Sequence, residues 1–140
     1  MIYIMLGVLA VSSLGVIALY ISALGIDSNE LDTEKKTDYK RIEQSEAKDI
    51  LDSGDEIILL DVRTQEEYSS GHIKDAVCFP VETIDMKFTE KYPDKGARFL
   101  IYCRSGRRSE AAARKLLDMG YTDVLDFGGI NTWEYDITKE

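Results

Sequence analysis

The stretch that decides the fold reads Arg98-Phe-Leu-Ile-Tyr-Cys103-Arg-Ser-Gly-Arg-Arg-Ser109. From Arg98 to Cys103 it is a near-continuous apolar run, which is typical of a β-strand covered on both faces of a sheet. From Ser109 to Met119 the sequence is rich in alanine and leucine, and Gly120 follows, which predicts a helix that ends near this glycine. A strand, a short basic loop and a helix therefore follow one another here.

The same alternation extends on both sides of this stretch. We expect strands at 56–61, 76–79 and 121–126, and helices at 46–52, 64–69 and around Trp133. Ser45 and Thr64 precede the first two helices and are candidate N-caps. Strands that alternate with helices predict an α/β domain built on a parallel sheet.

Charge divides the chain into parts of different composition. The 140 residues carry a net charge of −9, yet no Asp, Glu, Lys or Arg occurs before Asp27. An acidic chain argues against nucleic-acid binding, which needs a basic surface. Two cysteines are too few for a disulfide scaffold, and without a Cys-x-x-Cys or a histidine cluster no metal site and no cofactor is expected.

Residues 2–26 are uncharged and read as a single transmembrane helix. At about 1.5 Å per residue such a helix is long enough to cross a hydrocarbon core of about 30 Å. Tyr3 and Tyr20 lie near its two ends, where interfacial aromatic rings are favoured. A cleaved signal peptide is the alternative, with Ala23-Leu-Gly25 as a small-x-small cleavage site, although the basic segment that usually precedes such a peptide is missing. A buried core helix is a third, less favoured interpretation.

The residues after this segment predict a tether and a membrane orientation. Residues 27–40 contain five acidic and three basic side chains and little apolar surface, so we expect a solvated, flexible tether. The globular domain is then 41–140, with a net charge of −7. Basic residues follow the span (Lys35, Lys36, Lys40 and Arg41), which places this domain on the cytoplasmic side by the positive-inside rule.

The loop from Cys103 to Ser109 predicts the chemistry. It leaves the carboxyl end of a strand and enters a helix N-terminus, where unpaired N–H groups and the helix dipole favour anions. Gly106 allows a left-handed backbone, and Arg104, Arg107 and Arg108 add positive charge. Cys103 is then expected to be a thiolate nucleophile that meets an anionic substrate or intermediate. The alternatives are an inert buried cysteine beside a solvated basic loop.

Three separated motifs resemble the single-domain rhodaneses, which are thiosulfate sulfurtransferases. They are Cys103-Arg-Ser-Gly-Arg-Arg-Ser109, the stretch from Asp61-Val-Arg63 to Pro80, and Phe127-Gly-Gly-Ile130 with Trp133. The resemblance covers about residues 41–136 and implies a rhodanese-like parallel sheet with helices on both faces. Asp75 departs from the pattern, because a glycine is common at that position.

The resemblance implies a sulfur-transfer mechanism and assigns roles within the loop. Cys103 would take the outer sulfur of thiosulfate or another anionic sulfur donor as a persulfide and pass it to cyanide or a thiol acceptor. The residues that would bind the substrate are Arg104, Ser105, Gly106, Arg107, Arg108 and Ser109. Arg104 and Arg108 would bind the donor and orient the loop, whereas Arg107 would point outward and select donors or a partner.

The spacing within the loop separates related chemistries. In the family that this chain resembles, sulfurtransferases have the loop pattern Cys-x4-Arg, and Cys103 and Arg108 fit it. The related phosphatases and arsenate reductases have Cys-x5-Arg, which would require an arginine at position 109, where this chain has Ser109. An enzyme of the second kind is therefore disfavoured. A binding or regulatory module without turnover, in which the basic loop docks an acidic partner, is the non-enzyme alternative.

Several other residues have a structural and a chemical interpretation. We expect Asp61 and Arg63 to brace the loops by hydrogen bonds, and Tyr68 and Trp133 to pack. His72 is read as structural rather than as an acid or base. Cys78 is expected to be a small buried residue, with a thiol that resolves the persulfide as the alternative.

Overall fold

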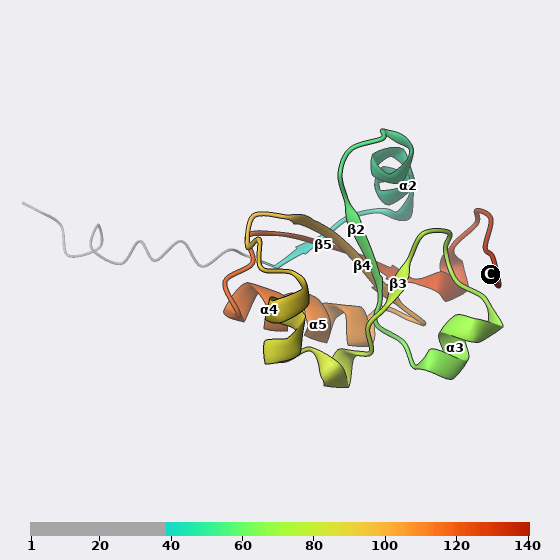
Figure 1. Ribbon diagram of the computed structural model, residues 1–140. Helices are drawn as coiled ribbons and strands as arrows, with labels where there is room; N and C mark the ends of the chain where they lie inside the picture. Colours follow the sequence, from blue (N-terminus) through green and yellow to red (C-terminus); the bar gives the residue numbers. More distant parts are fainter. Residues whose placement is uncertain (1–38) are drawn as a thin grey trace, which may run out of the picture. The chain divides into compact units, whose positions relative to one another are not determined.

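The computed structural model describes residues 39–140, and this part forms an α/β unit (Figure 1). The predicted transmembrane segment, 2–26, and all but the end of the predicted tether, 27–40, lie outside the described residues. Within residues 39–140, no helix has both the length and the apolar character that a membrane crossing requires.

The sheet has five strands in the order β1-β5-β4-β2-β3, and each neighbouring pair is parallel, so the predicted parallel sheet is confirmed. The strands are β1 (Lys40–Arg41), β2 (Ile58–Asp61), β3 (Val77–Cys78), β4 (Arg98–Cys103) and β5 (Asp123–Gly129). The bounds of β4 are those predicted, whereas β5 begins later and runs on to the second of two glycines. β1 was not predicted, because a charged pair at the boundary between the predicted tether and the predicted domain gave no strand signal; Lys40 pairs with Leu125.

The helices follow the predicted order with changed bounds. They are α2 (Gln44–Asp52), α3 (Gln65–Ser70), α4 (Met86–Lys91) and α5 (Arg107–Asp118), with 3-10 turns at Val81–Thr83 and Ile130–Thr132. Thr64 caps α3 as expected, since its hydroxyl accepts the N–H of Glu67 and the Glu67 carboxylate accepts the N–H of Thr64.

Two expectations about the helices were wrong, and one helix was not predicted. Glu43, not Ser45, is the N-cap residue of α2, and it makes no side-chain capping bond. The helix expected around Trp133 is the 3-10 turn Ile130–Thr132, which ends before the tryptophan. α4 was missed because its six residues carry no long apolar period; it is fixed by the Asp85 cap and by fully buried Phe88.

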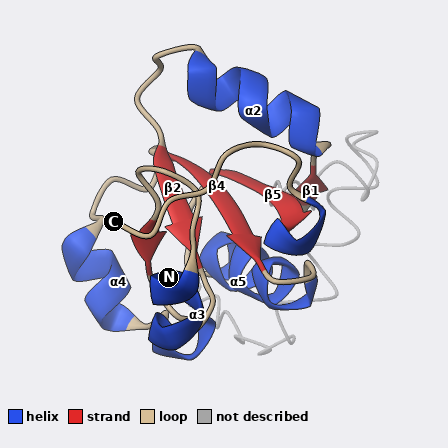
Figure 2. Ribbon diagram, turned by 90° about the vertical axis from the view of Figure 1, so that its right-hand side faces the viewer, coloured by secondary structure: helices blue, strands red, loops and turns tan. Residues whose placement is uncertain are grey.

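The helices α2 and α5 lie on opposite faces of the sheet (Figure 2). The sheet separates two apolar clusters, and β4 contributes alternate side chains to each. Phe99, Ile101 and Cys103 lie in the cluster that includes residues of α4 and α5. Leu100 and Tyr102 lie in the other cluster, with Ala47 of α2. Burial on both faces explains why the sequence of β4 is apolar without alternation. It also confirms that helices cover both faces.

Candidate active site

The Cys103 loop sits at the carboxyl edge of the sheet, between β4 and the N-terminus of α5. β4 ends at Cys103, and α5 begins at Arg107, two residues earlier than predicted. Gly106 is the N-cap residue, with φ of 102°, a left-handed conformation that L-residues rarely adopt. The predicted turn at this glycine is therefore present, and it directs the loop backbone toward the sulfur.

The Cys103 sulfur lies among hydrogen-bonding groups of the loop and the first turn of α5. Its residue is only 1 % exposed; the Gly106 N–H lies 3.0 Å from Sγ and the Ser109 hydroxyl 3.6 Å from it. Burial by itself raises the pKa of the thiol, but hydrogen bonds from Ser109 and from the backbone of Ser105 and Gly106 outweigh it and lower the pKa below its usual value. The geometry thus favours a thiolate at the base of the loop.

The loop rests on the last residue of β5. Cys103 and Gly129 are partners in the parallel register, and the Asn131 N–H donates to the Arg104 carbonyl at 3.1 Å. A Cβ atom on Gly129 would lie 2.2 Å from that carbonyl oxygen and 2.6 Å from the Ser105 Cα, which are overlaps with backbone. Only a residue without a side chain therefore allows β5 to support the loop this closely.

Arg108 is engaged by a carboxylate of α3 instead of standing free in the loop. Its Nη1 and Nη2 donate to the two carboxylate oxygens of Glu67, at 2.7 and 2.8 Å. These hydrogen bonds lower the pKa of Glu67 to about 2. Arg108 thus ties the first turn of α5 to α3, and this pairing leaves its guanidinium less available to a donor. The sequence contained no signal for the partner, Glu67, which lies 41 positions away.

Arg104 and Arg107 differ from the other arginines of the chain. Both are exposed, and neither has a carboxylate partner within residues 39–140. The remaining arginines form the ion pairs Arg41–Asp126, Arg63–Asp61, Arg98–Asp123, Arg108–Glu67 and Arg114–Glu110. The guanidinium groups left for an external anion are therefore the two that flank the Gly106 turn.

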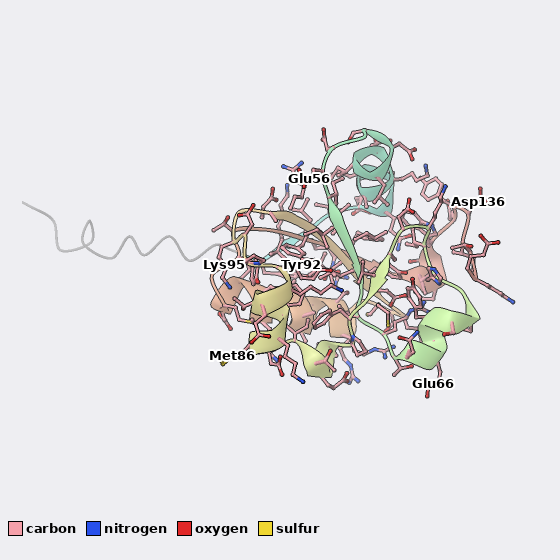
Figure 3. All side chains as sticks on the ribbon, in the orientation of Figure 1. Glu56, Glu66, Met86, Tyr92, Lys95 and Asp136 are labelled. Atoms are coloured by element: carbon pink, nitrogen blue, oxygen red, sulfur yellow. The ribbon has the colours of Figure 1, made fainter. Side chains whose placement is uncertain are left out.

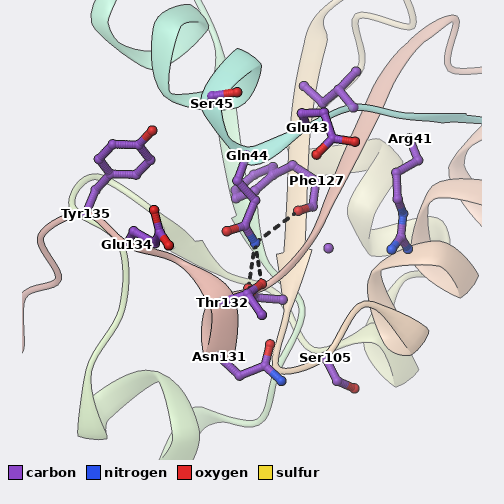
Figure 4. A pocket seen from close by; sticks show the side chains of 13 residues that line it. Arg41, Glu43, Gln44, Ser45, Ser105, Phe127, Asn131, Thr132, Glu134 and Tyr135 are labelled. Atoms are coloured by element: carbon purple, nitrogen blue, oxygen red, sulfur yellow. Dashed lines mark hydrogen bonds between the residues drawn. The ribbon is translucent and has the colours of Figure 1, made fainter.

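Ser105 forms part of a cavity of about 530 Å³ beside the loop (Figure 4). The cavity lies between the start of α2 and the end of β5, and Arg41, Gln44 and Tyr135 also line it. The Gln44 amide donates to the Gly129 carbonyl at 2.8 Å and so joins α2 to the residue under the loop. Cys103 is not among the lining residues, so this cavity adjoins the loop and does not contain the sulfur.

Asp61 and Arg63 form a buried ion pair, with 0 % and 5 % of each residue exposed. Arg63 Nε lies 2.9 and 3.0 Å from the two Asp61 carboxylate oxygens, and Nη2 donates to one of them at 2.6 Å. Nη2 also donates to the Gly71 carbonyl at 2.7 Å, on the far side of α3. The pair therefore braces the segments before and after α3, the bracing role expected from the sequence. Neither residue bonds to the Cys103 loop.

A second support was not predicted at all. Asp126, fully buried in the middle of β5, accepts hydrogen bonds from the Arg41 guanidinium at 2.7 Å and from the Tyr39 hydroxyl at 2.5 Å. The same Arg41 Nη2 donates to the Gly106 carbonyl at 3.0 Å. Arg41 and Tyr39 fell at the predicted boundary of the tether, so nothing in the sequence marked them as neighbours of the loop.

The other residues considered from the sequence are placed as follows. His72 is buried and stacked on Tyr68, with ring centroids 3.7 Å apart, and its Nδ1 lies 2.9 Å from the Tyr68 carbonyl. These contacts agree with the structural role expected for it. Asp75 adopts φ of 66°, so it takes up the left-handed turn itself where a glycine would be usual. Figure 3 draws the side chains of the described residues as sticks on the ribbon.

Cys78 does not lie where it could pair with Cys103. It pairs with Asp61, which in turn pairs with Tyr102, so two strand spacings of about 4.8 Å each separate Cys78 from β4. The distance of about 10 Å exceeds the Cα separation of about 7 Å that a disulfide tolerates. Burial raises the pKa of the Cys78 thiol. The alternative of a resolving thiol is therefore wrong for this arrangement of the strands.

With this geometry in hand, comparison with known proteins defines the class. Residues 43–136 match the rhodanese-like domain family, so the chain belongs to that family. It is 35 % identical over 71 residues to the thiosulfate sulfurtransferase PspE of Escherichia coli, and the aligned segment covers 51 % of this chain and 68 % of that protein. It is also 35 % identical over 106 residues to a sulfurtransferase of Allochromatium vinosum, covering 75 % and 87 % respectively. The chain is accordingly a sulfurtransferase-like enzyme.

Solved structures agree with this placement. A rhodanese from Escherichia coli, described with anions, superposes with a TM-score of 0.55 at 31 % identity, covering 60 % of this chain and 99 % of that one. A rhodanese-like domain protein from Staphylococcus aureus gives a TM-score of 0.64 at 28 % identity, covering 72 % and 98 %. The predicted rhodanese-like fold of the described domain is thus confirmed.

Proposed function

We propose that the protein transfers sulfane sulfur from thiosulfate or another anionic persulfide donor to a thiol or cyanide acceptor, through a persulfide on Cys103. The observation that carries this proposal is the Gly106 N–H, which donates to Sγ at 3.0 Å; the Ser109 hydroxyl, 3.6 Å from Sγ, can donate as well once the sulfur is a thiolate. The sulfurtransferase names of the relatives support the same reaction class.

The reaction has two balanced half-steps. The Cys103 thiolate attacks the outer sulfur of thiosulfate, the S–S bond of the donor breaks, and sulfite leaves with the electron pair. The resulting persulfide anion remains beside the N–H groups at the start of α5, which have no carbonyl partner within the helix. An acceptor thiolate or cyanide then attacks the outer sulfur, a new bond to that sulfur forms, and the Cys103 thiolate is released.

The two unpaired arginines support an anionic donor. Arg104 and Arg107 are exposed beside the sulfur of a domain that is otherwise acidic, so they attract a small anion to this edge of the sheet. Arg108 is held by Glu67 and is assigned to orienting the loop. Ser105, Gly106 and Ser109 contribute backbone or hydroxyl donors.

Persulfide formation tests the proposal directly. The purified 140-residue chain, kept in detergent where needed, is incubated with thiosulfate, and peptides are analysed by mass spectrometry. We expect one added sulfur on the Cys103 peptide and none on the Cys78 peptide. Cys103→Ser is expected to lose sulfur transfer while keeping the thermal transition of the parent chain. Full activity in that variant would overturn the assignment.

The same experiment separates the alternative functions. A chain that forms no persulfide with any sulfane donor would instead be a rhodanese-like binding module. Turnover of arsenate or a phosphate ester would indicate the oxyanion chemistry that the Cys-x4-Arg spacing of Cys103 and Arg108 disfavours.

For the location of the enzyme we propose a single-pass membrane anchor at residues 2–26, with the domain on the cytoplasmic side. The uncharged stretch and the basic residues that follow it support this proposal. Ser28→Cys gives a thiol beside the span for labelling intact cells with a membrane-impermeant maleimide. Protection from the reagent, together with retention in the membrane after alkaline extraction, is expected. Labelling from outside would reverse the orientation, and release of a shortened chain would indicate a signal peptide.

A further inference from the structure

The Ser109 hydroxyl has one proton and three acceptors within reach. Its Oγ lies 3.1 Å from the Gly106 carbonyl, 3.3 Å from the Gly128 carbonyl and 3.6 Å from Cys103 Sγ. When Cys103 is a thiol, its S–H can donate to this hydroxyl. A thiolate can only accept, so a hydrogen bond between the two then needs the Ser109 proton, which is drawn away from a carbonyl. The Gly106 carbonyl is the nearer of the two.

The Gly106 carbonyl is satisfied without Ser109. It accepts the backbone N–H of Glu110 at 3.1 Å, as the first helical bond of α5, and Arg41 Nη2 at 3.0 Å. A carbonyl oxygen has two lone pairs, so these two donors suffice. With Glu110 on one lone pair and Arg41 on the other, the Gly106 carbonyl competes less for the Ser109 proton; without Arg41 the second lone pair would be open to that hydroxyl.

Arg41 is itself held in place. The fully buried carboxylate of Asp126 accepts a hydrogen bond from Arg41 Nη2 at 2.7 Å, and Arg41 Nε donates to the Tyr39 hydroxyl at 2.9 Å. Tyr39 donates to the same carboxylate at 2.5 Å; burial and this bond to Asp126 raise the tyrosine pKa to about 12, so it stays protonated. A Cβ on Gly106 would lie 2.9 Å from Arg41 Nη1, which shows how closely the guanidinium follows the turn.

We propose that Arg41 is a positioning residue of the sulfur-transfer site: anchored by Asp126, it occupies the Gly106 carbonyl and thereby leaves the Ser109 hydroxyl free to donate to the Cys103 sulfur. This inference rests on the proposed role of Cys103 as a thiolate nucleophile. It makes the junction between the N-terminal segment and the domain part of the active-site support, because Tyr39 and Arg41 stand at that junction.

Site-specific alkylation of Cys103 measures the effect without any sulfur donor. The 140-residue chain is treated with iodoacetamide, an uncharged reagent that the loss of a cation does not steer, and the Cys103 peptide is quantified against time from neutral to alkaline pH. In Arg41→Ala the rate at pH 7 is expected to fall by about three- to tenfold, which is the loss of about one hydrogen bond to the thiolate. At alkaline pH, where the thiol ionises fully, the rates of variant and parent are expected to converge.

A double-mutant cycle tests whether Arg41 acts through Ser109. In a Ser109→Ala background the Arg41→Ala substitution is expected to cause no further loss at pH 7. An equal loss in both backgrounds, an unchanged rate in Arg41→Ala, or a loss that persists at every pH would overturn the proposal. If Arg41→Ala does not fold, Arg41→Lys is used in both backgrounds, where one ammonium cannot serve Asp126 and Gly106 equally well.

Arg98→Ala is the matched control. Arg98 is also a half-exposed strand arginine paired with a β5 carboxylate, Asp123, but it lies at the opposite end of β4 from Cys103. In Arg98→Ala, Cys103 is expected to be alkylated at the same rate as in the parent chain. Because alkylation needs no turnover, the proposed function and this inference can fail separately. Absence of a persulfide in the parent chain would remove the former, and absence of coupling between Arg41 and Ser109 would remove the latter.

Discussion

The two guanidinium nitrogens of Arg108 bind the two carboxylate oxygens of Glu67, so an arginine of the Cys103 loop is fixed to α3 rather than directed into open solvent. The same carboxylate closes the capping box of Thr64. One side chain, Glu67, thus begins one helix and positions the first turn of another.

Acid is expected to break this link. The folded-state pKa of Glu67 is lowered to about 2 from 4.5, mainly by the hydrogen bonds from Arg108. A carboxyl group whose pKa is lowered by folding stabilises the folded state at pH values above its unfolded-state pKa. This stability is lost as the pH falls toward its folded-state pKa. Glu67→Gln is therefore expected to reduce the free energy of unfolding by about 1 kcal/mol at pH 7. In denaturant titrations, the difference in the free energy of unfolding between Glu67→Gln and the parent should shrink as the pH falls from 4.5 to 2. A difference that does not change with pH would contradict the lowered pKa of Glu67.

Gly129→Ala is expected to disable the site by moving the loop. The added methyl would overlap the Arg104 carbonyl, 2.2 Å away, and neither backbone can yield easily. Overpacking of this kind destabilises by about 1–3 kcal/mol. Thermal melts and persulfide formation measure the two effects. Gly96→Ala is the control: its nearest neighbour would lie 3.4 Å away, so little change is expected, and a Gly129 variant as active as this control would refute the predicted overlap.

Arg104→Ala and Arg107→Ala are expected to weaken donor binding. Each removes an exposed, unpaired charge beside the sulfur, so we expect KM for thiosulfate to rise about two- to fivefold with kcat little changed. The difference should fade at high ionic strength because salt screens exposed charges. Arg114→Ala provides the comparison, because Arg114 lies on α5 with Arg107 but is paired with Glu110. Equal effects in all three variants would indicate net charge alone.

Arg63→Ala is expected to be the most destabilising single change near the site. It would leave the Asp61 carboxylate fully buried and without its ion-pair partner, which costs about 3–5 kcal/mol. Asp61→Asn combined with Arg63→Ala leaves no buried charge and is expected to recover part of the loss. Chemical denaturation measures both variants. A loss below about 1 kcal/mol in Arg63→Ala would show that the pair is dispensable.

Cys78→Ser is expected to keep sulfur transfer. The register places Cys78 two strands away from Cys103, too far for a disulfide. Oxidation of the parent chain followed by non-reducing peptide mapping should give no Cys78–Cys103 link. Detection of that link would mean that the strands rearrange on oxidation.

How far the sequence predicts the molecule depends on the range of the interaction. Local signals succeed: the apolar run from Arg98 to Cys103 is β4 with the same bounds, and the Thr64 cap is present. Elements with weak local signals fail, as for β1, which is two charged residues long. That strand exists because the backbone edge of β5 accepts it, not because of its own side chains.

The sequence by itself determined that a cysteine, a glycine with a left-handed backbone and three arginines stand where a buried strand passes into a helix, because these are properties of neighbouring residues. Only the tertiary structure decided what each arginine does. Arg108 finds Glu67, Arg41 finds Asp126 and Gly106, and Arg104 and Arg107 find no carboxylate within residues 39–140. Such pairings depend on which strand and helix ends the parallel crossovers bring to one edge of the sheet, and no local pattern encodes those contacts.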